Sequence, residues 1–320
     1  MGTESGAIYQ VNYTKRIIEC VFQLHNSAVN TLFINEGICI TGSSDKYVRV
    51  WPLDFSDFFI EAELENSVVS VVTSKDGFKA LIGDSNGSIG ILEISSQNYR
   101  SVLRSHTKCV LDVASDPNKM EFATVSLDGT IRIWDLTTLN QRYQFDIDGE
   151  KPTCIDYHKF DHLIACGFQT GIVRVFEVSS TQVLEEYKAH LTDVLSIAYT
   201  YDSRWLISSS KETICVSDTK HMYQPVRVIS YSGECNRVCL SLSRDGRFFS
   251  CIGPNKNAIH VYNCKDFEES YIFETPSDLF EAICFSSDSK EIIASTSDKK
   301  LMTISLELGE ILSETVSVNY

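Results

Sequence analysis

A repeat of about 42 residues runs through the chain and constrains its fold more than any other feature. The clearest copy is DGTIRIWDL at 128–136, with Trp134 near its end. Equivalent segments follow one another at intervals of 41, 42, 42, 41, 45 and 42 residues, at Trp51, Leu92, Trp134, Phe176, Ser217, Tyr262 and Ile304. A fixed period of about 40–45 residues is typical of the blades of a β-propeller.

Each period contains four strand signals separated by turn residues. In the third period the apolar or alternating runs are 109–114, 121–125, 130–136 and 141–147. Asp116-Pro117-Asn118 and Asp128-Gly129 mark the turns between the first three. No window shows a sustained helical period of apolar residues. We therefore predict an all-β chain that forms a seven-bladed β-propeller with four antiparallel strands in each blade.

The segments outside the seven periods set the expected domain boundaries. The propeller is predicted over 15–307, with an N-terminal extension at 1–14 and a C-terminal extension at 308–320. Residues 15–24, KRIIECVFQL, have no inner strands of their own. We expect them to form the outer strand of the blade begun at 281–306, so that the N-terminal strand closes the last blade. Both extensions look strand-like, and the second is a candidate start of a further propeller in a longer protein.

A recurring polar set strengthens the blade assignment. The period and its DGTIRIWDL copy resemble the WD40 repeat, whose blades link a histidine, a serine or threonine, an aspartate and the indole of a tryptophan. The two full sets expected as structural tetrads are His25, Ser43, Asp45 and Trp51 in the first repeat, and His106, Ser126, Asp128 and Trp134 in the third. Buried imidazole and indole groups need hydrogen-bond partners. The fifth repeat keeps His190 but has Lys211 and Ser217, so we expect its network to be broken. Because the set repeats, we interpret it as structural and not as a catalytic triad.

Charge and cysteine content narrow the class of protein further. The formal net charge is −15, from 43 acidic and 28 basic residues, which argues against a nucleic-acid-binding face. The 11 cysteines lie mainly within predicted strands and are expected to be reduced core thiols. The opening residues MGTESGAIYQ lack the features of a signal peptide, and no apolar run is long enough to span a bilayer. These features predict a cytoplasmic protein without membrane contact.

One enzyme motif occurs, and its context argues against catalysis. Gly83-Asp84-Ser85-Asn86-Gly87 fits GxSxG, but the nucleophile elbow needs a strand followed by a helix. Here both flanking segments, KALIG and SIGILEI, are predicted strands joined by an Asn-Gly hairpin. Zinc-protease, Walker and kinase signatures are absent. We expect no enzymatic activity, no cofactor and no metal site.

Candidate protein-binding residues fall in two groups. The loops between blades and between the second and third strands share one rim, which we expect to carry Lys108, Lys151, Phe168, Gln169, Lys211, Arg237, Asn255 and Phe280. The second group is Phe55, Phe58 and Phe59 in the segment DFSDFF at 54–59. Three aromatic side chains so close together exceed what a turn needs. Packing between blades would explain them, and a docking patch is the alternative.

Four segments carry a resemblance to a known family. VRVWPLDFSDFF, RSHTKCVLDVA, ATVSLDGTIRIWDL and ACGFQTGIVRVFEV together resemble the WD repeat-containing protein 90 family, most clearly over 25–180. The resemblance implies a protein of the centriole, centrosome or ciliary basal body that takes part in microtubule architecture and assembly. Proteins of this family carry an N-terminal microtubule-binding module that has no counterpart here, so microtubule contact is expected through other parts of a longer protein.

These observations favour a non-catalytic WD40 scaffold that binds other proteins, and the resemblance implies that its partners are centriolar or ciliary components. A substrate receptor of a ubiquitin ligase is the alternative among binding proteins. Such receptors often carry Trp-Asp-x-Arg, whereas here Leu136-Thr137 follow Trp134-Asp135 and Pro52 follows Trp51. A serine hydrolase using Ser85 is the alternative from another class, and a fluorophosphonate probe would distinguish it.

Overall fold

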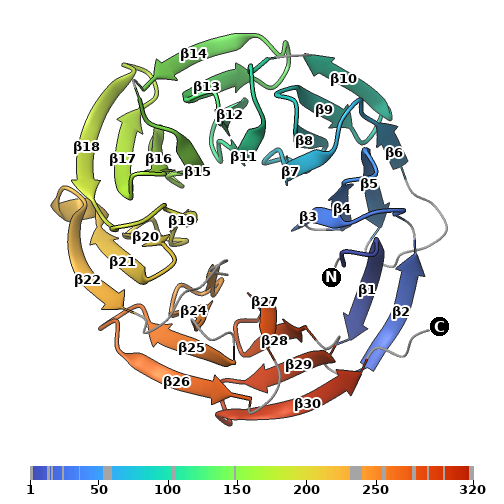
Figure 1. Ribbon diagram of the computed structural model, residues 1–320, viewed down its shortest axis with the longest axis vertical. Coiled ribbons are helices and arrows are strands. Elements are labelled where there is room, and N and C mark those ends of the chain that lie inside the picture. Colours follow the sequence, from blue (N-terminus) through green and yellow to red (C-terminus); the bar gives the residue numbers. More distant parts are fainter. Residues whose placement is uncertain are drawn as a thin grey trace. The chain divides into compact units, whose positions relative to one another are not determined.

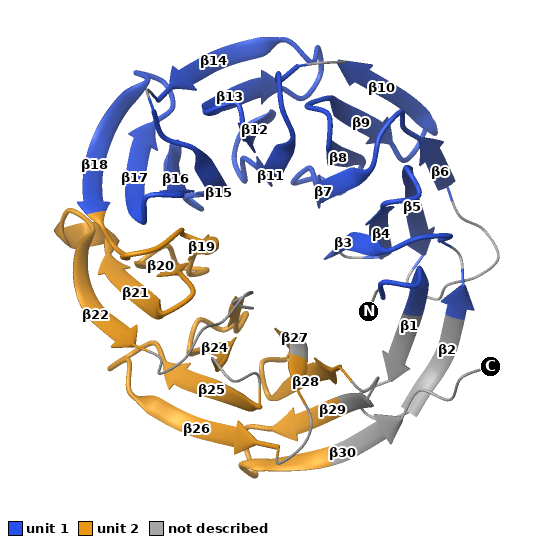
Figure 2. Ribbon diagram, viewed as in Figure 1, with its two compact units in different colours: residues 1–9, 21–187 blue, residues 10–20, 188–320 orange. Residues whose placement is uncertain are grey.

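The computed structural model consists almost entirely of short antiparallel strands (Figure 1). It describes residues 3–12, 15, 17–23, 25–35, 37–52, 60–102, 105–147, 149–230, 240–253, 257–275, 279–286, 288–297 and 300–316. Within these residues there are 30 strands, and the one helical element is the 3-10 turn η1 at Thr219–His221. The chain divides into two compact units, residues 1–9 with 21–187 and residues 10–20 with 188–320 (Figure 2).

The first unit contains four four-stranded sheets, each built from strands consecutive in sequence. They are β3 (Val29–Asn35), β4 (Ile38–Ser43), β5 (Tyr47–Pro52) and β6 (Ile60–Glu63); β7 (Val68–Thr73), β8 (Lys79–Asp84), β9 (Ile89–Glu93) and β10 (Asn98–Val102); β11 (Val110–Ser115), β12 (Glu121–Ser126), β13 (Thr130–Asp135) and β14 (Gln141–Asp146); and β15 (Pro152–Tyr157), β16 (Leu163–Phe168), β17 (Ile172–Glu177) and β18 (Gln182–Lys188).

The second unit contains three sheets of the same kind. They are β19 (Ser196–Tyr199), β20 (Trp205–Ser209), β21 (Thr213–Asp218) and β22 (Gln224–Ser230); β23 (Leu240–Leu242), β24 (Phe248–Ile252), β25 (Ala258–Asn263) and β26 (Glu269–Glu274); and β27 (Phe280–Phe285), β28 (Glu291–Thr296), β29 (Lys300–Ser305) and β30 (Glu310–Val316). A further two-stranded sheet joins β1 (Ala7–Asn12) to β2 (Ile17–Gln23).

The period predicted from the sequence is confirmed strand by strand. Each anchor residue of the repeat, from Trp51 to Ile304, lies in the third strand of its sheet. In the third repeat the four predicted segments agree with β11–β14 to within one residue at each boundary. The alternation of apolar and polar residues between turn residues is therefore sufficient to locate these strands.

The last sheet differs from the expectation. Its fourth strand is β30, which pairs with β29 from Lys300↔Val316 to Ser305↔Glu310. The segment 15–24, which we expected in this position, instead contributes β2 to the sheet with β1. A short turn with Gly309 at φ +67° connects β29 to β30. Closing this short loop costs much less chain entropy than bringing the opposite end of the chain to the same edge. The predicted C-terminal extension therefore supplies a strand of the last sheet.

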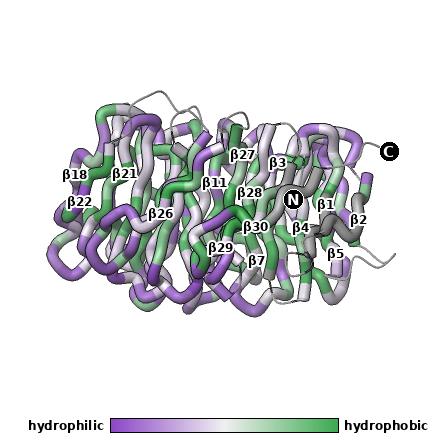
Figure 3. Tube along the Cα trace, turned by 90° about the horizontal axis from the view of Figure 1, so that it is seen from below, coloured by the Kyte–Doolittle hydropathy of each residue, from purple (hydrophilic) through white to green (hydrophobic). Residues whose placement is uncertain are grey.

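The core lies within and between neighbouring sheets of each unit. All six residues of β12 are buried, whereas most of the outer strand β14 is exposed or half-buried. In the first unit Val125 and Phe145 belong to one apolar cluster with Ile155 and Phe176 of the next sheet. Hydrophobic residues gather along the strands and hydrophilic residues at the connecting turns (Figure 3). Rigid strands thus carry polar turns at their ends.

Polar side chains on the inner strands also join neighbouring sheets of the first unit. The pairing of β11 with β12 is interrupted by a register shift between Val110 and Asp112. Asp112 accepts hydrogen bonds from the Ile155 amide at 3.1 Å and from Ser70 Oγ at 3.4 Å. Its carboxylate therefore bridges β7, β11 and β15. Burial raises the pKa of Asp112 to about 6, although these hydrogen bonds favour the ionised form.

Candidate functional site

The first polar network joins a histidine, a threonine, an aspartate and a tryptophan. His25 is fully buried, and its Nδ1 lies 2.9 Å from Asp45 Oδ2. Its Nε2 lies 2.8 Å from Thr41 Oγ1, which also accepts a hydrogen bond from Trp51 Nε1 at 3.2 Å. A neutral imidazole fits this chain, because it donates to Asp45 through one nitrogen and accepts from Thr41 through the other.

The third repeat contains the same network. His106 Nδ1 lies 3.0 Å from Asp128 Oδ2, and His106 Nε2 lies 2.7 Å from Thr124 Oγ1. Trp134 Nε1 donates to the same hydroxyl at 2.8 Å. The structure thus brings together the predicted histidine, aspartate and tryptophan of each set.

The hydroxyl of each set is a threonine two residues before the predicted serine. Ser43 donates to the Ser27 carbonyl at 3.1 Å and accepts the Asp45 amide at 3.1 Å. Ser126 makes the equivalent bonds to Lys108 and Asp128. Both serines therefore hold the turn that carries the aspartate, and they do not contact the imidazole or the indole. Residues i and i+2 of a strand lie on the same face of the sheet. The serine and the threonine two residues before it were therefore equally good candidates for the hydroxyl of the network.

The fifth repeat keeps only part of the network, without the aspartate and the indole. His190 Nε2 lies 2.8 Å from Ser208 Oγ, and His190 Nδ1 lies 2.6 Å from Thr213 Oγ1. Ser208 takes the place of Thr124, and Thr213 that of Thr130, which lies 3.0 Å from His106 Nδ1. The imidazole therefore keeps a partner at each nitrogen although Lys211 stands where the aspartate would be.

The electrostatics of these networks suit a structural role. Burial lowers the pKa of His106 to about 4, and burial likewise lowers the pKa of His190 to about 4. Burial alone would raise the pKa of Asp128, but hydrogen bonds from the Thr130 hydroxyl and the Thr107 amide bring it down to about 2. A neutral, fully buried imidazole whose hydroxyl partner is itself bonded to an indole offers no group to a substrate.

The predicted rim residues divide into exposed lysines and buried phenylalanines. Lys108 and Lys151 are exposed, and Lys211 is half-buried. Phe168 and Phe280 are fully buried, Phe168 beneath the guanidinium of Arg174 at 4.8 Å from the ring centre. Both rings belong to the core because they lie in strands and not in loops. Phe280 is the first residue of β27, and Phe168 is the last residue of β16. The other candidates, Arg237, Asn255, Phe55, Phe58 and Phe59, lie outside the described residues.

Three exposed apolar side chains escaped the sequence analysis. Phe78, Met120 and Phe160 lie in the turns between the first and second strands of three successive sheets of the first unit, and they are 62%, 48% and 67% exposed. We call them the turn row. Their spacing of 42 and 40 residues repeats the blade period, and the recurrence of an apolar residue at this interval in predicted turns was the available signal.

Hydrogen bonds connect the turns that carry the turn row. Asn118 Nδ2 donates to the Lys159 carbonyl at 2.9 Å, which joins the turns of Met120 and Phe160. Lys79 Nζ donates to the Leu136 carbonyl at 3.3 Å, and the Leu136 amide donates to the Met120 carbonyl at 3.0 Å. The three turns therefore form one connected surface. Lys75 and Lys119 are exposed beside them.

Two sites of possible chemistry were also located. Ser85 lies in the hairpin between β8 and β9, with its amide bonded to the Ser67 carbonyl, and no helix follows. This geometry differs from a nucleophile elbow. In the described part of the chain, one group of side chains has the arrangement of metal ligands, namely Asp116, Glu121 and His162. No helix among the described residues is long and apolar enough to cross a membrane.

Comparisons with known proteins agree with this architecture. A family model described as the WDR90/POC16 second beta-propeller matches residues 114–320, and one described as WD domain, G-beta repeat matches residues 18–52. A crystal structure of the computationally designed Ika8 protein superimposes with a TM-score of 0.80 over 95% of this chain and 92% of that one. Its sequence identity of 16% indicates a shared fold alone.

Several curated proteins are similar over most of the chain. WD repeat-containing protein 90 of Mus musculus is 33% identical over 91% of this chain, and that of Xenopus tropicalis is 31% identical over 91%. Centriole proteome protein 16 of Chlamydomonas reinhardtii is 35% identical over 98%. The matched regions cover only 16%, 17% and 15% of these relatives, so the chain spans less than a fifth of their length. From the family model and these identities, the chain belongs to the WDR90/POC16 family of WD40-repeat proteins.

Proposed function

We propose that this chain is a non-catalytic protein-binding scaffold, a single seven-bladed WD40 propeller within a longer protein of the centriole or cilium. The turn row is the observation that carries the binding role. Large apolar side chains that stand mostly exposed on three neighbouring turns are typical of a surface that a partner covers. Binding residues on loops above rigid sheets are the usual arrangement in folds of this kind.

The family relationship supports the cellular setting. One similar protein is named centriole proteome protein 16, and others are cilia- and flagella-associated proteins 44 and 52. The net charge of −15 disfavours broad contact with acidic surfaces, among them nucleic acid and the microtubule lattice. We therefore assign microtubule contact to other parts of the longer protein, and protein partners to this propeller.

The test is a double substitution of the turn row in the full-length protein. Phe78→Asp with Phe160→Asp should leave the melting temperature unchanged, because both rings are more than half exposed. The variant should lose recruitment to centrioles or basal bodies, and proximity labelling should lose a defined set of neighbours. Leu308→Asp is the matched control, because Leu308 is 66% exposed in the turn between β29 and β30.

Two outcomes would contradict parts of the proposal. Unchanged recruitment and labelling by the double variant would remove the turn row as the interface. Unchanged recruitment after deletion of the whole propeller would remove the scaffold role of this region.

A further inference from the structure

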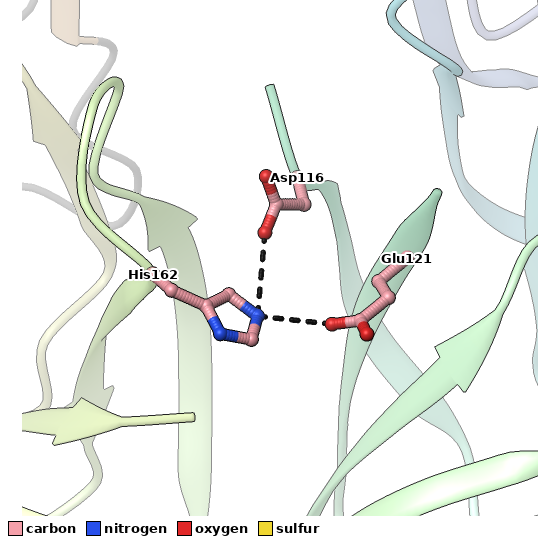
Figure 4. Close-up of side chains that lie close together, drawn as sticks. All are labelled: Asp116, Glu121 and His162. Carbon is pink, nitrogen blue, oxygen red and sulfur yellow. Dashed lines mark hydrogen bonds and ion pairs between the residues drawn. The ribbon is translucent and has the colours of Figure 1, made fainter. Parts of the chain in front are cut away.

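Two carboxylates and an imidazole converge at the end of the first unit that carries the turn row (Figure 4). Asp116 follows β11, Glu121 begins β12, and His162 lies in the turn before β16 of the neighbouring sheet. His162 Nε2 lies 2.9 Å from Glu121 Oε2 and 3.5 Å from Asp116 Oδ2. The three ligand atoms lie within 4.8 Å of one another. Ligands about 2.0–2.2 Å from a common ion have separations of this size.

The second atom of each ligand is held by a different group. Asp116 Oδ1 accepts the amides of Asn118 and Lys119 at 2.7 and 2.9 Å. Glu121 Oε1 accepts from Arg142, and His162 Nδ1 lies 2.9 Å from Ser179 Oγ. Outer partners of this kind orient the ligands of metal sites and leave one atom of each free to coordinate. The carboxylates are 3% exposed and the imidazole is 13% exposed, so the cluster is screened from water but reachable through His162.

A buried phenol provides an independent indication of a ligand. Tyr157 is fully buried, and its hydroxyl has no hydrogen-bond partner in the described structure. Burial, followed by the charges of Asp116 and Glu121, raises the pKa of Tyr157. The hydroxyl therefore lies in the field of the same two carboxylates. An unsatisfied buried hydroxyl is costly in a native protein, and a bound ion or its water would satisfy it.

We propose that Asp116, Glu121 and His162 bind one divalent transition-metal ion, zinc(II) in the first instance, with the Tyr157 hydroxyl as a hydrogen-bond partner of metal-bound water. One imidazole and carboxylate oxygens suit zinc, whereas magnesium and calcium favour oxygen ligands alone. Binding replaces the proton on His162 Nε2 and transfers the imidazole proton to Nδ1. The ion would then join two neighbouring sheets through the turns that carry Met120 and Phe160.

Two positively charged side chains, Arg142 and Lys119, contact the proposed ligands. Arg142 bonds the outer oxygen of Glu121, and its side chain is 44% exposed, so it can stay in place. Lys119 Nζ lies 2.6 Å from His162 Nδ1, which must carry a proton once Nε2 binds the ion. The exposed Lys119 side chain therefore has to move away. Removing its charge should favour binding.

The experiment uses the chelator-treated full chain titrated with ZnCl2 and with CoCl2 at neutral pH. One equivalent of zinc should bind by calorimetry and raise the melting temperature. Cobalt should give d–d absorption without the intense thiolate band that binding to the 11 cysteines would produce. This measurement on the unmodified chain does not depend on the folding of any variant.

Variants then assign the ligands. His162→Gln should abolish binding, Tyr157→Phe should weaken it by about tenfold, and Lys119→Ala should tighten it. His221→Ala is the matched control, because that imidazole is 75% exposed in the second unit and should not affect binding. Absence of saturable zinc and cobalt binding by the unmodified chain would overturn the proposal, as would unchanged binding by folded His162→Gln. The outcome of these binding measurements does not depend on whether the proposed scaffold function is correct.

Discussion

At the scale of single residues, one buried hydroxyl connects the two aromatic members of each polar network. Thr124 Oγ1 contacts both the imidazole of His106 and the indole of Trp134. Removing such a hydroxyl leaves an indole N–H and an imidazole nitrogen unsatisfied in the core, which is more costly than losing a solvent-exposed hydrogen bond.

Thr124→Val keeps the shape of the side chain and removes this hydroxyl. We expect a loss of about 1–3 kcal/mol in the free energy of unfolding, measured by urea denaturation. Thr137→Val, at an exposed position in the turn after β13, should change it by less than about 0.5 kcal/mol. Equal effects of the two substitutions would contradict the role assigned to Thr124.

The fifth repeat offers a paired test of the replaced aspartate. Thr213→Val should destabilise the fold because Thr213 Oγ1 is the partner of His190 Nδ1. Lys211→Ala should have little effect, since the lysine side chain is half-buried at the surface and contributes nothing to that contact. A larger loss for Lys211→Ala, measured as the shift in melting temperature, would show that the network is organised differently.

The buried histidines predict a loss of stability in mild acid. The pKa of His106 is about 4 in the folded chain and about 6.5 when unfolded, so the unfolded state binds more protons between these values. The contribution of neutral His106 to the free energy of unfolding is fully present above pH 6.5. It decreases as the pH falls towards 4, by roughly 3 kcal/mol at most.

Urea midpoints at several pH values should therefore decrease below pH 6.5, and less steeply in His106→Gln. Comparing the two proteins cancels the opposite contribution of Asp112, whose raised pKa favours the folded state as the pH falls below about 6. Identical pH profiles would show that His106 does not titrate as described.

At the scale of elements, each sheet is completed by a strand that is local in sequence. β30 protects the outer edge of β29, and Ile311 packs against the apolar cluster that contains Ile304 and Met302. An unpaired edge of β29 would expose its backbone groups and invite aggregation.

Truncation after Leu308 removes β30 and should lower the melting temperature sharply or cause aggregation, as followed by light scattering. Truncation after Val316 removes only residues 317–320, beyond the last paired residue, and should change neither property. If both truncations behave like the full chain, β30 does not complete the sheet in solution.

At the scale of the whole molecule, the proposed seven-bladed propeller predicts that the two compact units unfold together. In a single seven-bladed propeller, a lesion in one blade should weaken the others, because every blade needs both neighbours. Two independent units would instead lose stability separately.

Hydrogen exchange measured by mass spectrometry distinguishes these cases. Thr124→Val lies in the first unit, and we expect it to accelerate the slowest exchange of β20 and β21 in the second unit as well. Acceleration confined to residues 21–187 would contradict a single cooperative ring.

The repeat, the strands and most members of the polar networks were determined by the sequence alone. Turn residues and the alternation of apolar and polar residues mark each strand locally. A period of about 42 residues recurs because every sheet is built from the same four-stranded unit. His25, Asp45 and Trp51 were identifiable for the same reason, since a blade offers each of them one position.

Where the local sequence allowed two alternatives, only the tertiary structure distinguished them. Thr41 and Ser43 share one face of β4, and only the position of the imidazole across the sheet selects Thr41. β2 and β30 are both apolar enough to fill an edge, and the shorter loop selects β30. Phe160 is exposed while Phe168 is buried, because one stands in a turn and the other in a strand covered by its neighbours. Exposure and partner choice depend on distances through space, which spacing along the chain does not specify.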